Sequence, residues 1–143
     1  PMAERTAEGL RAIAQMPSPL TAAVATSWIR EGGADKILAG VRREARARRA
    51  VAAEVLPEAR GAAEGIHVWL DLPPGWDAGR VHRLAQEKGL SLVTAETFAA
   101  SDAHPSGLRI SLGGPSSRAV LRGGLESVAA LLKGAGSPAR VVV

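Results

Sequence analysis

Two short segments of this sequence alternate between apolar and polar residues, and this pattern limits the folds that the chain can adopt. Successive side chains of a strand point to opposite faces, so each segment predicts a strand with one apolar face and one polar face. The first covers residues 66–72 and the second residues 108–112. Each strand needs a cover on its apolar face only, which favours a sheet with helices packed on one side.

The N-terminal third of the chain predicts helices. Residues 3–15 are rich in Ala, Glu, Arg and Leu, which are good helix formers. A second helix is expected over residues 19–29, with Ser18 as its N-cap and Pro19 at its first position. The two glycines at 32–33 end that helix.

A long third helix is expected from Asp35, as the capping residue, to about residue 56, before Pro57. Its apolar residues recur at helical spacing and form one stripe. The stripe consists of Ile37, Leu38, Val41, Ala45, Ala52 and Val55.

The second half of the chain mixes helices with strands. Asp77 is expected to cap a helix that ends before Gly89, and residues 90–95 predict a short strand. Ser116 or Ser117 caps a last helix that runs to about residue 133. The tail at 141–143 is either a short edge strand or a frayed end. The expected fold is therefore α+β, with N-terminal helices followed by a small sheet that has helices on one face.

Composition excludes several kinds of site. The 143 residues include no cysteine, which excludes disulfides, thiolate zinc sites and a cysteine nucleophile. His67, His82 and His104 have no metal-ligand spacing, so we expect no metal site. No apolar run approaches the ~20 residues that span a bilayer, so we expect no membrane segment, and no signal peptide opens the chain. No nucleophile elbow, Walker loop or dinucleotide motif is present.

Five arginines lie close together in the predicted third helix, and the pattern leaves two interpretations open. They form either a phosphate-binding stripe or the solvated face of an amphipathic helix, opposite the apolar stripe. The five are Arg42, Arg43, Arg46, Arg48 and Arg49.

Arg109 is the strongest candidate for a binding residue. It lies in the middle of the strand at 108–112, on the face opposite Leu108 and Ile110. A guanidinium on a rigid strand is well suited to bind a carboxylate through two parallel hydrogen bonds. The alternative is an ordinary arginine that faces solvent on a one-sided sheet.

Four segments, in the order in which they follow one another along the chain, resemble the small domain of fold type I pyridoxal-phosphate (PLP) aminotransferases. The resemblance is to the MocR subgroup of GntR-type bacterial regulators in particular, whose aminotransferase-like domain follows a winged helix-turn-helix. The upstream helices, including Arg48 and Arg49, fit the segment that links the large and small domains. The four segments are residues 65–73 (GIHVWLDLP), 93–98 (VTAETF), 108–114 (LRISLGG) and 117–118 (SR).

The resemblance implies a domain organisation and an incomplete protein. Residues 1–33 would close the large domain, residues 34–57 would form a long interdomain helix, and residues 58–143 would form the small domain. The resemblance then implies that the chain is a C-terminal fragment, catalytically inactive alone, of a cytoplasmic and homodimeric regulator. DNA would be bound only through a missing N-terminal domain, with no membrane partner.

The same resemblance implies a site. Arg109 matches the arginine that binds the α-carboxylate of an amino-acid ligand in the intact protein, and an amine is the other ligand class. The PLP-binding residues, including the Schiff-base lysine, belong to the missing large domain. Lys36, Lys88 and Lys133 have no matching context, so we expect no catalytic and no cofactor-binding residue in this chain, and no covalent cofactor.

Two other functions remain open. In the first, the intact protein is a metabolic PLP-dependent aminotransferase without a DNA-binding domain. In the second, the chain is an independent α+β interaction module. An upstream region of ~70 residues with helix-turn-helix character would select the regulator.

Overall fold

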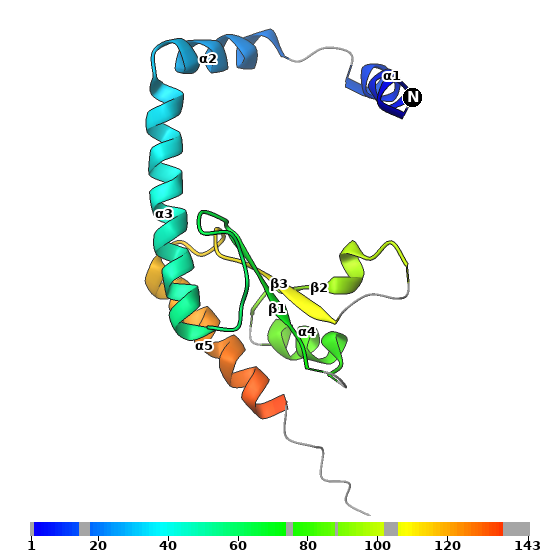
Figure 1. The fold of residues 1–143 in the computed structure, drawn as a ribbon, viewed down its shortest axis with the longest axis vertical. Coiled ribbons are helices and arrows are strands. Elements are labelled where there is room, and N and C mark those ends of the chain that lie inside the picture. The colour runs from blue at the N-terminus through cyan, green and yellow to red at the C-terminus, as the bar shows by residue number, and fades with distance from the viewer. Residues whose placement is uncertain (1, 15–17, 74–75, 88, 102–105, 136–143) are drawn as a thin grey trace, which may run out of the picture. The chain divides into compact units, whose positions relative to one another are not determined.

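The computed structural model describes residues 2–14, 18–73, 76–87, 89–101 and 106–135, and these have an α+β fold, as predicted (Figure 1). Among the described residues there are five α-helices, three strands and one short 3-10 helix. Their order is α1 (Met2–Ala14), α2 (Pro19–Arg30), α3 (Gly33–Val55), β1 (His67–Asp71), α4 (Ala78–Glu87), β2 (Val93–Thr94), the 3-10 helix η1 (Ala95–Phe98), β3 (Gly107–Ser111) and α5 (Arg118–Ala135).

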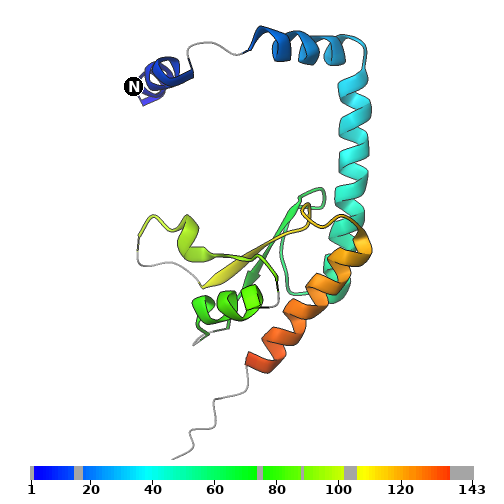
Figure 2. The same ribbon diagram turned by 180° about the vertical axis from the view of Figure 1, so that it is seen from behind.

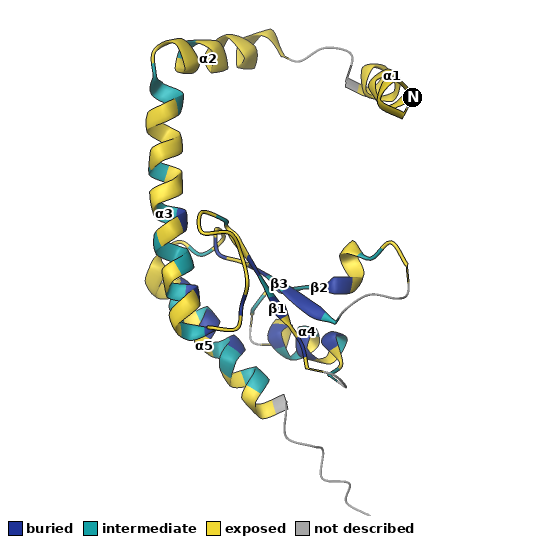
Figure 3. Cartoon of the chain, viewed as in Figure 1, coloured by how far each residue is buried: buried dark blue, intermediate teal, exposed yellow. Residues whose placement is uncertain are grey.

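The chain divides into two compact units, Pro1–Val41 and Arg42–Val143, and the first has no core of its own. None of its described residues is buried, and Figure 3 shows α1 and α2 as exposed over most of their length. The predicted apolar stripe of α3 is buried only at Ala45 and Ala52. Its N-terminal members belong to the first unit and are exposed to between 44% and 54%: Ile37, Leu38 and Val41.

One predicted helix start differs from the structure, and a second is confirmed in position but not in its capping contact. α3 begins at Gly33, directly after Gly32 adopts a φ of 71°, so Asp35 lies in the first turn and is not the cap. Ser18 precedes α2 as expected, but its side chain makes no capping hydrogen bond. The Ser18 carbonyl instead accepts hydrogen bonds from the Ala22 amide and the Thr21 hydroxyl.

The predicted helix ends in the second unit are confirmed. The Asp77 carboxylate accepts a hydrogen bond from the Arg80 amide at the start of α4. Gly89 follows α4 with a φ of 72°, a conformation that favours glycine. Of the two candidate caps for α5, Ser117 is the one whose hydroxyl accepts from a backbone amide, that of Val120.

The sheet is antiparallel, with strand order β1-β3-β2, so β3 lies in the centre. In the register between β1 and β3, Trp69 lies opposite Arg109 and His67 opposite Ser111. β2 is shorter than the predicted strand over residues 90–95: pairing with β3 begins only at Val93, and η1 begins at Ala95. Val93 pairs with Arg109 on the other side of β3.

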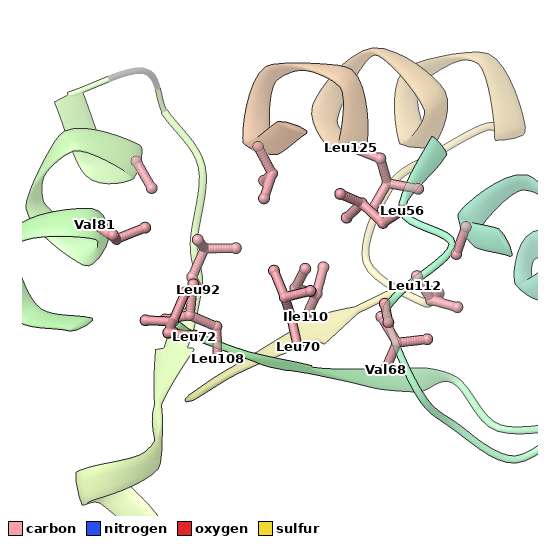
Figure 4. Packing of buried hydrophobic residues seen from close by; sticks show 14 of the residues in the cluster. Leu56, Val68, Leu70, Leu72, Val81, Leu92, Leu108, Ile110, Leu112 and Leu125 are labelled. Atoms are coloured by element: carbon pink, nitrogen blue, oxygen red, sulfur yellow. The ribbon is translucent and has the colours of Figure 1, made fainter. Parts of the chain in front are cut away.

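One face of the sheet packs against α4, α5 and the C-terminal part of α3. Figures 2 and 4 show α4 and α5 on the same side of the strands, with the apolar strand residues directed between them. The cluster is built from alternate strand positions and one face of each helix. Its largest fully buried side chains are Leu56, Leu70, Leu108, Leu112, Leu125 and Val68.

Several predictions concern residues outside the described part of the chain. These are the lysine at 88, the histidine at 104 and the tail at 141–143. In the part of the chain that the structure describes, no helix is long and apolar enough to cross a bilayer.

Candidate functional site

The side chain of Arg109 lies on the face of the sheet that the helices leave uncovered, which we call the open face. The neighbouring residues on β3, Leu108 and Ile110, are 0% and 5% exposed and belong to the core, whereas Arg109 is half-buried. β3 is paired on both sides near Arg109, with Trp69 on β1 and Val93 on β2. The predicted orientation of Arg109 is therefore confirmed, and the backbone that carries it is held from two sides.

An aromatic ring covers the guanidinium of Arg109. The Cζ atom lies 4.8 Å from the centroid of the Phe98 ring, within the range of a cation–π contact. Phe98 ends η1, the short helix that follows β2. The rings of Phe98 and Trp69 meet edge to face, with centroids 6.5 Å apart and planes at 62°.

The indole of Trp69 is fixed in turn by polar contacts and by a glycine. Its Nε1–H donates a hydrogen bond of 2.8 Å to Asp71, and the Asp71 carboxylate also pairs with Arg60. The backbones of Arg60 and Trp69 exchange two hydrogen bonds of 2.6 and 2.7 Å. A Cβ atom at Gly107 would lie 2.6 Å from Cζ2 of the indole, so only glycine fits beneath this ring.

Among the described residues, the guanidinium of Arg109 has no carboxylate or carbonyl partner. Its Nε atom is buried and forms no hydrogen bond. An unpaired buried donor costs free energy, and a guanidinium carries five N–H donors in a planar fork. The guanidinium is therefore in aromatic contact with Phe98, and no side chain or carbonyl among the described residues pairs with it.

Two further polar residues share the open face with Arg109. His67 and Ser111 lie opposite each other in the register, and both are exposed. Ser111 is two residues from Arg109 on β3, which places its side chain on the same face. The arrangement suits a small anionic ligand, with the guanidinium as the charged group and the hydroxyl and imidazole as polar neighbours.

A cavity lies beside this site, between the segment that leads into β2, β3 and α5. It has a volume of about 500 Å³ and is mostly apolar, with α5 contributing Leu121, Leu125 and Val128. Arg109 is part of its wall, but Phe98, which covers the guanidinium, is not. The cavity is thus adjacent to the site and distinct from the surface beside the guanidinium.

The described residues do not form a PLP site. Lys36 and Lys133 are exposed on α3 and α5, and no acidic partner for a pyridine nitrogen or cluster of phosphate donors accompanies either one. A lysine that binds PLP covalently needs desolvation and a surrounding cradle. We therefore derive no reaction step through this cofactor. The described part of the chain also has no group of three metal-ligating side chains.

The arginines of α3 serve mainly as internal links. Arg48, with a side chain that is 12% exposed, donates hydrogen bonds of 2.7 and 2.8 Å to the carbonyls of Leu112 and Pro115. Arg49 donates to the carbonyl of Ala59, and Arg42 lies 3.2 Å from the Glu64 carboxylate. Arg46 pairs with the same carboxylate. These bonds join α3 to the loop before β1 and the loop after β3, and they involve four of the five arginines; Arg43 is exposed.

Glu44 joins α3 to the start of α5. Its carboxylate accepts a hydrogen bond of 2.6 Å from Arg118 and one of 2.8 Å from Arg48. The hydrogen bonds from Arg118 and then Arg48 lower the pKa of Glu44 from 4.5 to about 2. The same contact raises the pKa of Arg118, so the pair stabilises the charged form of both groups.

Comparison with solved structures identifies aminotransferases. An archaeal alanine:glyoxylate aminotransferase superposes with a TM-score of 0.63 at 20% identity, over 78% of this chain and 29% of that one. The α-aminoadipate aminotransferase LysN of Thermus thermophilus, crystallised with N-(5'-phosphopyridoxyl)-L-leucine, gives 0.61 at 26% identity, over 76% and 29%. The predicted aminotransferase-like fold is confirmed, and the chain spans 29% of the length of each of these proteins. No protein-family model and no curated protein matches the chain in sequence.

The sequence predicts the face of the strand on which Arg109 lies, but not the residues that surround it. In the sequence, Phe98 is only the end of a motif, and Trp69 is only a residue on the polar face of its strand. The register that brings Trp69 opposite Arg109 is a long-range pairing, which local pattern does not specify. The one available signal was Gly107 directly before the strand, since a glycine in or beside a strand often marks a close approach.

Proposed function

We propose that this chain is the small-domain part of a PLP-dependent aminotransferase-like protein and that Arg109 binds the α-carboxylate of an amino-acid ligand in it. The observation that carries the proposal is the guanidinium on the central strand, held by Phe98 and without a hydrogen-bond partner among the described residues. Charge-assisted hydrogen bonds to a carboxylate would satisfy its donors. The cofactor in that protein would be held by residues outside this chain.

The exposed N-terminal unit supports the proposed domain organisation. We assign residues 1–33 to the end of a large domain, residues 34–57 to an interdomain helix and residues 58–143 to the small domain. Helices stable in water need a packed apolar face, and no described residue of the first unit is buried. The cover for α2 would come from the large domain, in line with the larger size of the structural neighbours.

Two biological roles fit this proposal. The sequence motifs favour a MocR-type regulator, in which amino-acid binding would bias a DNA-binding state. Both structural neighbours are enzymes in their own names, which favours a metabolic aminotransferase instead. The roles differ in whether a winged helix-turn-helix of ~70 residues precedes the PLP domain in the intact protein. Specific DNA binding by the intact protein would select the regulator, and its absence together with amino-group transfer would select the enzyme.

The test of the carboxylate role uses the intact protein loaded with PLP and titrated with L-leucine, followed by the visible absorbance of the cofactor. Arg109→Ala removes the charge and both hydrogen bonds, and should weaken L-leucine binding by at least tenfold, on the order of 1.5–3 kcal/mol. Arg109→Lys keeps the charge but not the planar fork, so it should also weaken binding.

Two controls isolate the carboxylate. Isoamylamine is leucine without its carboxylate, and its binding should be the same in the wild type and in Arg109→Ala. Arg80→Ala removes an exposed arginine from α4, on the covered side of the sheet, and should bind L-leucine like the wild type. Wild-type affinity for L-leucine in Arg109→Ala would show that Arg109 is an ordinary surface residue.

A further inference from the structure

We propose that Phe98 is a positioning residue for Arg109: its ring fixes the plane of the guanidinium and thereby sets the direction from which a carboxylate is bound. The inference rests on the proposed function, because it concerns how Arg109 presents its donors to the ligand. It is carried by the cation–π contact of 4.8 Å and by the edge-to-face packing of Phe98 on Trp69.

A stacked ring holds a guanidinium without occupying its hydrogen-bond donors. An ion pair with a carboxylate of the chain would also fix Arg109, but it would use the donors that the ligand needs. A cation–π contact uses the face of the ring and leaves the N–H groups in the guanidinium plane free. The Nε atom of Arg109 is buried and has no partner among the described residues, so no ion pair within this part of the chain fixes that end of the group.

The position of Phe98 is itself determined by the sheet. η1 follows β2 directly, and Thr94 of β2 pairs with Leu108 on β3. The first residue of η1, Ala95, is buried, with 5% of its surface exposed, which fixes the start of the short helix. On the other side, the Trp69 ring rests on Gly107 and is bound to Asp71. Phe98 is therefore backed by a fixed ring, although it is 50% exposed.

Packing alone does not explain why a phenylalanine that is half exposed stands at position 98. Half of a large apolar side chain in water contributes little to stability, so a leucine would serve a purely structural role about as well. A leucine has no ring face for the guanidinium, whereas a tyrosine has one. The pair of substitutions Phe98→Leu and Phe98→Tyr therefore separates the positioning role from apolar burial.

The experiment measures L-leucine binding to the PLP-loaded intact protein. Phe98→Leu should weaken binding about three- to tenfold, the range expected for loss of a partly desolvated cation–π contact. Phe98→Tyr should restore affinity to within about twofold of the wild type. In the Arg109→Ala background, Phe98→Leu should have no further effect, because a residue that acts through Arg109 cannot act without it. Isoamylamine binding should be insensitive to Phe98→Leu.

A second measurement reports on the stack without any ligand. In the 143-residue chain, the Nε–H proton resonance of Arg109 should lie upfield because of the Phe98 ring current. Phe98→Leu should shift it downfield and Phe98→Tyr should not. An unchanged resonance in Phe98→Leu would overturn the inference.

The outcomes separate this inference from the proposed function. If Arg109→Ala binds L-leucine normally, both are wrong. If Arg109→Ala weakens binding but Phe98→Leu does not, only the positioning role is wrong. If Phe98→Leu weakens isoamylamine and L-leucine binding equally, Phe98 acts on the ligand side chain or on the fold, and the positioning role is again wrong.

Discussion

Leu108 and Arg109 are neighbours on β3 that face opposite sides of the sheet, so substitution by alanine should affect the stability of the fold very differently at the two positions. Leu108 is 0% exposed in the core, whereas Arg109 lies on the open face. Truncating a buried leucine removes apolar contacts and leaves a cavity.

Leu108→Ala should therefore lower the free energy of unfolding by about 2–5 kcal/mol, measured by urea denaturation. Arg109→Ala should change it by less than about 1 kcal/mol, because no described partner loses a hydrogen bond. Equal losses at the two positions would contradict the assignment of the two faces.

At the scale of single residues, the sequence predicts the face of the sheet to which a side chain points, but not the residues that surround it. The alternation of residues 108–112 predicts which side chains enter the core, because the period of two is a local property of a strand. The contact between Arg109 and Phe98 depends on where η1 ends relative to β3, and no local signal determines that distance.

Among the elements, α3 and α5 are joined by an ion-pair group whose strength depends on pH. The pKa of Glu44 falls from 4.5 to about 2 on folding, because Arg118 and Arg48 stabilise its charged form. A carboxylate with a lowered pKa contributes stability above its unfolded pKa, and this contribution is lost as the pH falls towards the folded pKa.

Glu44→Gln should therefore be less stable than the wild type at pH 6, and the difference should shrink between about pH 5 and pH 2. Urea denaturation at several pH values measures this difference. Glu58→Gln, at an exposed carboxylate for which the structure shows no ion pair, serves as the matched control and should show no such trend. A gap for Glu44→Gln that is constant with pH would contradict the role of the ionised carboxylate.

Helix and strand types were predictable because caps and periodicity are local, whereas some ends were not. Gly89 and Ser117 mark ends correctly, since a positive φ and a capping hydroxyl act within one turn. α3 begins two residues before Asp35, because Gly32 already provides the left-handed turn that separates it from α2. β2 is short because its length is set by pairing with β3, which covers only Val93 and Thr94 and which the local sequence does not specify.

At the scale of the whole molecule, the two units differ in how they can be stable. The core lies entirely in Arg42–Val143, and the described residues of the first unit bury nothing. Amide exchange reports such differences, because exposed helices without packing open at little cost.

In the 143-residue chain, amides of α2 should exchange through openings of at most about 2 kcal/mol, whereas those of β3 should exchange near the global unfolding free energy. In the intact protein, α2 should become protected, because we assign its cover to the large domain. Hydrogen exchange followed by mass spectrometry measures both. A chain of residues 42–143 alone should keep the protection of β3. Protection of α2 in the 143-residue chain would contradict the absence of a core there.

The contact between Gly107 and Trp69 has a genetic consequence. Every missense change of a glycine codon by one nucleotide introduces a residue with a Cβ atom, and at this position that atom would meet the indole ring at 2.6 Å. The ring would have to leave its place against Phe98. Position 107 should therefore tolerate almost no missense variation in any organism that depends on the proposed site at Arg109.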